Sequence, residues 1–196
     1  MTIKFFISYA HHDNNKMEAL SRAIKKAKTP YITFMDPVSI NYQKRLDYQI
    51  RFMENNPGVA AIGSQAKYID HKNKIIQKSS FPLDTSDIVK NLILGTTFEP
   101  STLMINKTLL PKDIFKLQSS KPEFVYINLM LQISRYGKLL NLEKPLVYIK
   151  KVSKTNKLYS DFERFLEHIK LFIKSMETAG EKPTLKAFFS PLLPEI

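Results

Sequence analysis

Two short apolar runs separated by an amphipathic segment constrain the fold of this chain more than any other feature. The runs "IKFFISY" (3–9) and "YITFM" (31–35) are rich in aromatic and β-branched residues, as buried strands are. The segment "KMEALSRAIKKAK" (16–28) between them places its apolar residues on one helical stripe. Strand, helix and strand in this order predict a βαβ unit, with parallel strands and a right-handed crossover.

The loop after the second of these strands contains one acid, Asp36, directly before Pro37. In a βαβ unit this loop lies at the carboxyl end of a strand, where open α/β sheets bind their ligands. Asp36 is therefore a candidate contact for a metal ion or a phosphate. The residues alone leave an alternative open, which is an Asp that begins a turn before proline.

The remaining periodicity predicts further helices and strands, and the sequence shows no internal repeat. Short polar turns and glycines separate them. The expected elements are a helix at 40–57, two antiparallel strands at 59–70 and 74–78, a helix at 86–94 capped by Ser86 and ended by Gly95, a strand at 101–105, a buried helix at 124–136 ended by Gly137, two short strands "KLLNL" and "PLVYIKK", and a helix at 161–176.

The composition sets limits on the class of protein. The 196 residues are 43% hydrophobic and carry a net charge of +12, which fits either an anionic partner or a lysine-rich solvated surface. The chain has no cysteine, which excludes disulfides and thiolate zinc sites. No run approaches the roughly 18 apolar residues of a membrane span. We expect a cytoplasmic protein, with peripheral attachment to the cytoplasmic face of the membrane as an alternative.

Several stretches resemble the nucleotide-sugar glycosyltransferases of family 2, which have the GT-A fold. Residues 31–76, "YITFMDPVSINYQKRLDYQIRFMENNPGVAAIGSQAKYIDHKNKII", are similar to the family pattern of a strand, an acidic loop, "P-x-R-L-x-x-Q-x-x-F-L-x-x-N-P", "V-G-x-x-G-S" and "Y-I-D-x-x-G-x-I". "YGKLLNLEKPLVYIKK" resembles the segment that closes the family's domain. The resemblance covers most of residues 3 to about 151. It implies an α/β fold, with a mixed GT-A-like sheet flanked by helices.

The chain departs from the family pattern in three places. It begins about one βαβ unit later than the family, and that unit supplies most of the nucleotide pocket. The family's acidic loop reads D-x-D, because two carboxylates hold a divalent ion, whereas here Val38 follows Asp36 at the second position. The family's general base is an Asp in an "E-D" pair, and counting back from Gly137 without a gap puts that pair on Val125 and Tyr126.

The resemblance implies roles for four residues, and each role has a simpler alternative. Asp36 would lie near the donor diphosphate and its metal ion. Lys16 and Arg22 stand where the family has nucleotide-facing residues, although a solvated helix face is the simpler and preferred explanation. Glu123 is the nearest acid to the position of the base, and the alternative is an acid that the dipole favours at a helix N-terminus.

We therefore expect a GT-A-like domain at 1–151 that lacks the first βαβ, followed by a helical C-terminal tail at 152–196. One hypothesis is a glycosyltransferase, active or completed by a partner, that uses a nucleotide-sugar donor with Mn²⁺ or Mg²⁺. The alternative is a cofactor-free pseudoenzyme that serves as an adaptor or binding module. It would bind a protein through the C-terminal helix or the exposed sheet region, and we do not expect nucleic acid as a partner.

The tail helix has an unusually broad apolar stripe. We expect it either to pack back on the domain or to fill a groove in a partner chain. The stripe consists of Phe162, Phe165, Leu166, Ile169, Phe172 and Ile173.

Overall fold

The computed structural model describes most of the chain between residues 22 and 184. The ranges are 22, 24–36, 39–95, 97–112, 114, 124–151, 161–178 and 183–184, with side chains of the last helix described from 166 to 177. The predicted strand at 3–9 lies outside these residues, as does its parallel pairing with the strand at 31–35. Of the predicted helix at 16–28, residues 24–26 are described as helical.

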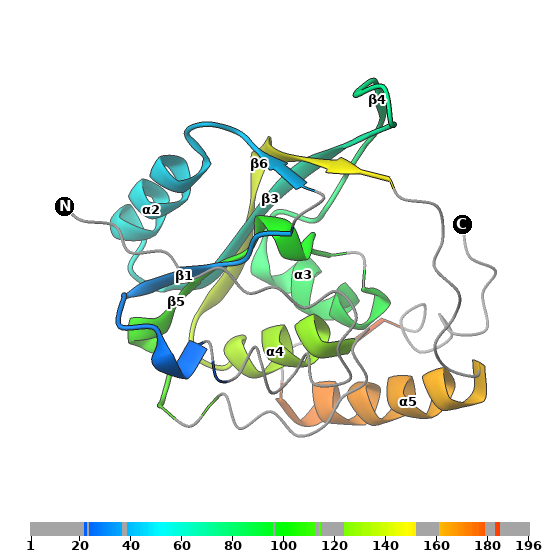
Figure 1. Cartoon of the computed structure of the whole chain (residues 1–196). Helices are drawn as coiled ribbons and strands as arrows, with labels where there is room; N and C mark the ends of the chain where they lie inside the picture. Colours follow the sequence, from blue (N-terminus) through cyan, green and yellow to red (C-terminus); the bar gives the residue numbers. More distant parts are fainter. Residues whose placement is uncertain are drawn as a thin grey trace.

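The described residues form a mixed sheet of six strands in the order β1-β5-β3-β6-β2, with β4 paired to β3 (Figure 1). Strands β3 and β6 are parallel, and the other pairs are antiparallel. The mixed sheet flanked by helices confirms the fold class that the GT-A resemblance implied. The strands are β1 (Tyr31–Thr33), β2 (Ser39–Asn41), β3 (Val59–Ile69), β4 (Ile75–Lys78), β5 (Met104–Asn106) and β6 (Lys138–Lys150).

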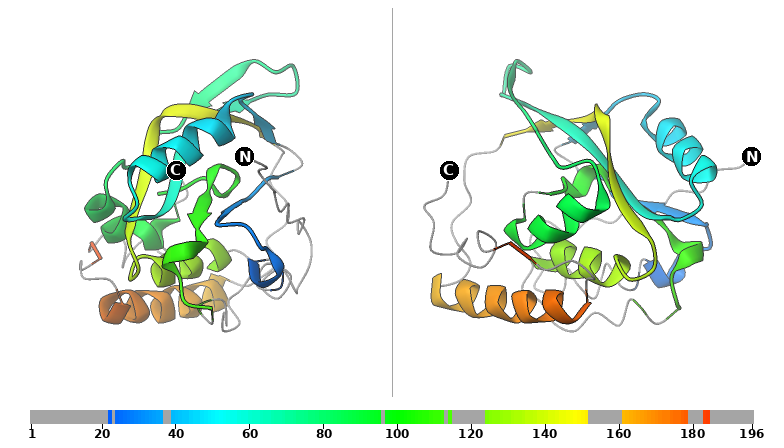
Figure 2. Two further views of the ribbon diagram at one scale, coloured as in Figure 1. Left: turned by 90° about the vertical axis from the view of Figure 1, so that its left-hand side faces the viewer. Right: turned by 180° about the vertical axis from the view of Figure 1, so that it is seen from behind.

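Helices cover both faces of the sheet (Figure 2). On one face Met53 of α2 packs against Ile62 of β3, and on the other face α3 and α4 form a larger core, with α5 packed against α4. Because both faces are covered, Val59 to Ala66 of β3 are all buried instead of alternating. The helices are α2 (Arg45–Asn55), α3 (Thr85–Asn91), α4 (Val125–Ile133) and α5 (Asp161–Thr178), with 3₁₀ turns η1 (Leu92–Leu94), η2 (Pro100–Thr102) and η3 (Lys107–Leu109).

Strand β6 corrects the prediction of two short strands. "KLLNL" and "PLVYIKK" belong to one strand that follows β3, with Ser64 opposite Leu142 and Ala66 opposite Val147. Strand β6 therefore advances five residues while β3 advances two, so three extra residues interrupt the ladder. Pro145, which has no N–H to donate, lies in this interruption, where the missing hydrogen bond costs little.

Two helix starts also differ from the prediction. The helix expected at 40–57 begins only at Arg45, because Ser39–Asn41 pairs with β6 as an edge strand. This pairing is a tertiary contact that local periodicity does not report. Asp84, not Ser86, caps α3, and its Oδ1 accepts a hydrogen bond from the Asp87 N–H at 3.0 Å.

The two glycines predicted to end helices, Gly95 and Gly137, are needed for different physical reasons. Gly95 follows η1 with φ of 70°, a left-handed conformation that glycine adopts without strain. Gly137 does not have a positive φ. A Cβ at Gly137 would lie 2.7 Å from the carbonyl oxygen of Gly58, so this glycine is needed for close packing at the start of β6.

Helix α5 confirms the predicted tail helix but buries a different face. Leu171 is in the core, and Lys174 Nζ donates to Asn128 Oδ1 of α4 at 2.6 Å. In contrast, Leu166 and Ile173 of the predicted stripe are 42% and 48% exposed. Residues 171 and 173 point to roughly opposite sides of a helix. The tail therefore packs back on the domain, with Leu166 and Ile173 of the stripe facing outward and Ile169 and Phe172 partly buried.

Candidate functional site

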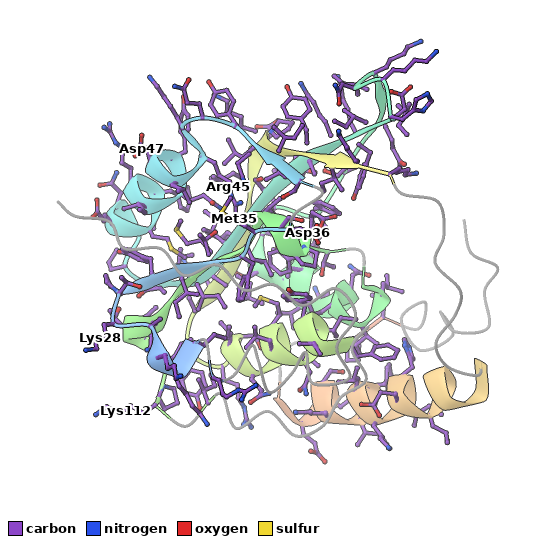
Figure 3. All side chains as sticks on the ribbon, viewed as in Figure 1. Lys28, Met35, Asp36, Arg45, Asp47 and Lys112 are labelled. Atoms are coloured by element: carbon purple, nitrogen blue, oxygen red, sulfur yellow. The ribbon has the colours of Figure 1, made fainter. Side chains whose placement is uncertain are left out.

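Asp36 lies just beyond β1, in a tight turn that leads directly into β2 (Figure 3). Its backbone oxygen accepts hydrogen bonds from the Ser39 N–H at 3.0 Å and from Ser39 Oγ at 2.7 Å. Asp36 is half-buried. Asp36 therefore does begin a turn, but through its backbone oxygen, so the turn makes no use of the carboxylate. Pro37 and Val38 lie outside the described residues.

Arg45 of α2 supports this turn from inside the protein. Its side chain is 1% exposed, and burial lowers its pKa to about 10, so the guanidinium is still charged at neutral pH. Both terminal nitrogens donate to the backbone oxygen of Phe34, at 3.4 and 3.3 Å. In the described part of the chain no carboxylate pairs with Arg45, so neutral acceptors alone satisfy the buried charge.

The other acceptors of Arg45 tie three elements together. One terminal nitrogen also donates to Asn41 Oδ1, and the other donates to Thr33 Oγ1 at 2.8 Å. Nε donates to Gln49 Oε1 at 3.0 Å. Gln49 in turn donates to the Thr102 backbone oxygen at 2.7 Å. Strands β1 and β2 and the start of α2 are thus fixed around the Asp36 turn.

Glu99 is a second carboxylate at this place, and sequence reasoning missed it. Its Oε1 caps η2 by accepting from the Ser101 N–H at 3.5 Å and also accepts from Ser101 Oγ at 3.0 Å. Its Oε2 accepts from the Tyr68 hydroxyl at 3.2 Å. Burial raises the pKa of Glu99, and the charge of Asp36 adds to the rise. The only signal in the sequence was a Glu directly before Pro and Ser, which is typical of a cap.

Tyr126 of α4 completes the cluster. Its ring meets the ring of Phe34 edge to face, with centroids 5.7 Å apart. Burial, followed by the charges of Asp36 and Glu99, raises the pKa of Tyr126 to about 12. Tyr126 is one of the two residues on which the ungapped count places the family's acidic pair. At this position of the family pattern the chain thus has a neutral hydroxyl, close enough for the charge of Asp36 to raise its pKa.

A cavity of about 90 Å³ lies against the same group of residues. Tyr126 lines it, together with Phe98 and Pro100 on either side of Glu99. Ligand pockets for small molecules typically measure about 300 to 1,000 Å³. The cavity is therefore too small for a nucleotide sugar, although it can hold water molecules or a small apolar group.

The structure describes one of the three other predicted site residues, Arg22. Lys16 and Glu123 lie outside the described residues, and Arg22 is exposed on the helical segment before β1. Among the residues described, no three His, Asp or Glu side chains form a group that could hold a metal ion. An ion at this place would need further oxygen ligands beyond Asp36 and Glu99. None of the described helices is long and apolar enough to span a bilayer.

The fold is similar to that of a solved protein, TarS from S. aureus. Residues 1–349 of TarS from S. aureus in complex with UDP-GlcNAc align with a TM-score of 0.60 and 16% identity, over 89% of this chain and 51% of that one. The same TarS fragment in complex with UDP aligns with a TM-score of 0.56 and 15% identity, over 89% of this chain and 49% of that one. At this identity the likeness establishes the fold, and this chain spans about half the length of the TarS fragment.

Sequence comparisons identify the family. An uncharacterized glycosyltransferase of Rickettsia conorii is 29% identical over 115 residues, which are 58% of this chain and 18% of that protein. The family model "Glycosyl transferase family 2" matches residues 3–115. This match spans more than half of the chain and includes the Asp36 turn, the Arg45 network and Glu99. The chain therefore belongs to glycosyl transferase family 2.

Proposed function

We propose that this chain transfers a sugar from a nucleotide-sugar donor, with the donor diphosphate bound at the Asp36 turn. The observation that carries the proposal is that Tyr126 packs edge to face on Phe34, two residues before Asp36, and that the charge of Asp36 contributes to the raised pKa of both Tyr126 and Glu99. Membership of family 2 and the likeness to a protein solved with UDP-GlcNAc support it.

The donor is held mainly through its diphosphate. Asp36 and the phosphate oxygens together would ligate Mg²⁺ or Mn²⁺, with water completing the shell, and the ion would neutralise the charge of the leaving diphosphate. Arg45 keeps the turn in place by binding the Phe34 oxygen. Lys16 and Arg22 remain candidates for contacts to the nucleotide. With one carboxylate at the family's D-x-D position, we expect weak donor binding.

Glu99 is the best-placed described group to accept the proton of the sugar acceptor. A general base works best when its pKa approaches the working pH, and burial moves the pKa of Glu99 in that direction. Tyr126 cannot take this role, because its pKa of about 12 keeps it protonated. Its hydroxyl can instead donate a hydrogen bond to the acceptor or to a phosphate oxygen. Glu123 remains a second candidate for the base.

The non-catalytic alternative has specific support as well. Tyr126 replaces a carboxylate where the resemblance places the base, and without a base proton transfer slows by roughly two to four orders of magnitude. The outward apolar side of α5, with Leu166 and Ile173 exposed, would then serve a protein partner. On this reading the domain retains the fold of a transferase as a binding module.

Release of free nucleotide from a panel of nucleotide sugars, with Mg²⁺ or Mn²⁺, tests the proposal. We expect slow, ion-dependent release that falls at least about tenfold in Asp36→Asn and in Glu99→Gln. Asp47→Asn is the matched control, because Asp47 is an exposed carboxylate on α2 (Figure 3). Release that is unchanged in Asp36→Asn contradicts the proposal. Binding of nucleotide without any release favours the binding module.

A further inference from the structure

The hairpin of β3 and β4 projects from the body of the protein (Figures 1 and 2). Every residue from His71 to Lys78 is exposed. Two adjacent isoleucines on β4 are among the most exposed large apolar side chains, with Ile75 43% and Ile76 50% exposed. The register shifts here, because Ile75 lies opposite Ile69 and Gln77 opposite Tyr68, which leaves Ile76 without a residue opposite it. An exposed apolar pair at a sheet edge is a surface that proteins normally avoid.

The same hairpin is strongly basic. Together with the adjacent end of β6 it contains six lysines and a single acid, Asp70. The carboxylate of Asp70 accepts the backbone N–H groups of Lys72 and Lys74, at 2.8 and 2.9 Å, so it holds the turn together. The six lysines are Lys67, Lys72, Lys74, Lys78, Lys150 and Lys151.

The contacts of these lysines leave their charges uncompensated. Lys67 lies over the ring of Tyr148, with Nζ 5.4 Å from its centroid. Lys151 lies over the ring of Tyr68 at 5.7 Å and donates to Gln77 Oε1 at 2.8 Å. In the described part of the chain no carboxylate forms an ion pair with any of the six. The hairpin therefore presents concentrated positive charge around two exposed isoleucines.

We propose that the β3–β4 hairpin docks this protein on a membrane surface that contains anionic phospholipids. Lysines near such a surface are attracted by its negative potential, and apolar side chains enter the boundary between headgroups and acyl chains. A soluble polyanion would satisfy the lysines but leave Ile75 and Ile76 in water. The combination of both features on one projecting element favours the membrane.

Docking through the hairpin would also fix the position of the candidate site relative to the membrane. Strand β3 continues from the hairpin into the sheet, and its Tyr68 donates to Glu99. The membrane would thus lie on the side of the molecule where β3 and β4 extend beyond the core (Figure 1). The docking does not depend on sugar transfer, so its test is independent of the function proposed above.

Co-sedimentation with vesicles tests the docking. One set of vesicles contains phosphatidylcholine alone, and the other contains about 30 mol% phosphatidylglycerol, at about 0.15 M salt. We expect binding to the anionic vesicles only. The triple variant Lys72→Gln, Lys74→Gln, Lys78→Gln lowers the partition coefficient about 100-fold, and the double variant Ile75→Ser, Ile76→Ser lowers it about 20-fold.

A second triple variant is the matched control for charge. Lys25→Gln, Lys28→Gln and Lys112→Gln remove the same charge from exposed positions away from the hairpin, where Figure 3 labels Lys28 and Lys112. We expect less than about threefold loss of binding in this control. An equal loss in both triple variants, or equal binding to both kinds of vesicle, overturns the proposal. Binding to polyphosphate as tight as to the vesicles, with no effect of the isoleucine variant, identifies a soluble polyanion instead.

Discussion

Replacement of Arg45 by methionine tests whether the buried guanidinium holds the candidate site together. Methionine has a similar length and no donor, so the variant removes the hydrogen bonds and largely keeps the volume. Two buried acceptors lose their only donor in the described structure, the Phe34 oxygen and Gln49 Oε1. Arg45 also donates to the Leu103 oxygen at 3.3 Å, but this acceptor keeps its bonds from Thr33 Oγ1 and from the Phe34 N–H.

The expected loss of stability follows from these acceptors. A buried acceptor without a partner costs about 1–3 kcal/mol, so two of them cost about 4 kcal/mol together. The lowered pKa of Arg45 shows that burial of the charge itself is unfavourable, and its removal offsets part of this cost. We therefore expect Arg45→Met to lower the free energy of unfolding by about 3 kcal/mol.

Urea unfolding followed by circular dichroism measures this loss. Arg51→Met on the exposed side of the same helix is the control, and we expect a change within about 0.5 kcal/mol. Arg45→Lys should lie between the two, because an ammonium cannot reach all the acceptors of the planar guanidinium. A loss below about 1 kcal/mol in Arg45→Met, or a loss equal to that of Arg51→Met, refutes the reasoning.

Three further variants test other parts of the structure, each by its free energy of unfolding. Glu99→Gln should stabilise the protein at neutral pH, because the raised pKa of Glu99 means that its ionised form is disfavoured in the folded state. The gain in stability should vanish below the ordinary pKa of 4.5, and a gain that grows toward acid pH contradicts this. Leu171→Ala should cost about 2–4 kcal/mol, whereas Ile173→Ala should cost less than about 1 kcal/mol; the reverse order would mean that α5 buries its other face. Gly137→Ala should cost more than about 1 kcal/mol by its contact with the Gly58 oxygen, and an unchanged midpoint counts against that contact.

Local periodicity was sufficient to locate the elements that are marked by a long apolar run or by a polar turn. The hairpin of β3 and β4, the buried helix α4 and the long helix α5 all lie where apolar runs and polar turns predicted them. Strand β2 was missed because its three residues form a strand only through pairing with β6. The buried face of α5 was wrong for a similar reason, since the helix contacts α4 through Leu171 and Lys174 and not through its most apolar side.

The sequence predicted only those site residues that a local pattern or a fixed spacing could locate. The strand predicted at 31–35 placed Asp36 in the loop that follows it, and β1 does end before Asp36, at Thr33. The count from Gly137 pointed to Tyr126, whose ring packs on Phe34 near Asp36. Glu99 could not be found in this way. It is more than sixty residues from Asp36 in the sequence, and only the antiparallel pairing of β1 with β5 brings the two segments together.

The most direct test of the account is a titration of the labelled protein with UDP and Mg²⁺, followed by NMR. We predict a dissociation constant no tighter than about 1 mM, equivalent to roughly −4 kcal/mol, with shifts centred on Asp36 and Glu99. The shifts should disappear in Asp36→Asn and persist in Asp47→Asn. Absence of any shift at Asp36 at nucleotide concentrations about ten times higher contradicts a donor site at this turn. Micromolar, ion-dependent binding that Asp36→Asn abolishes contradicts the weak binding expected of a single carboxylate.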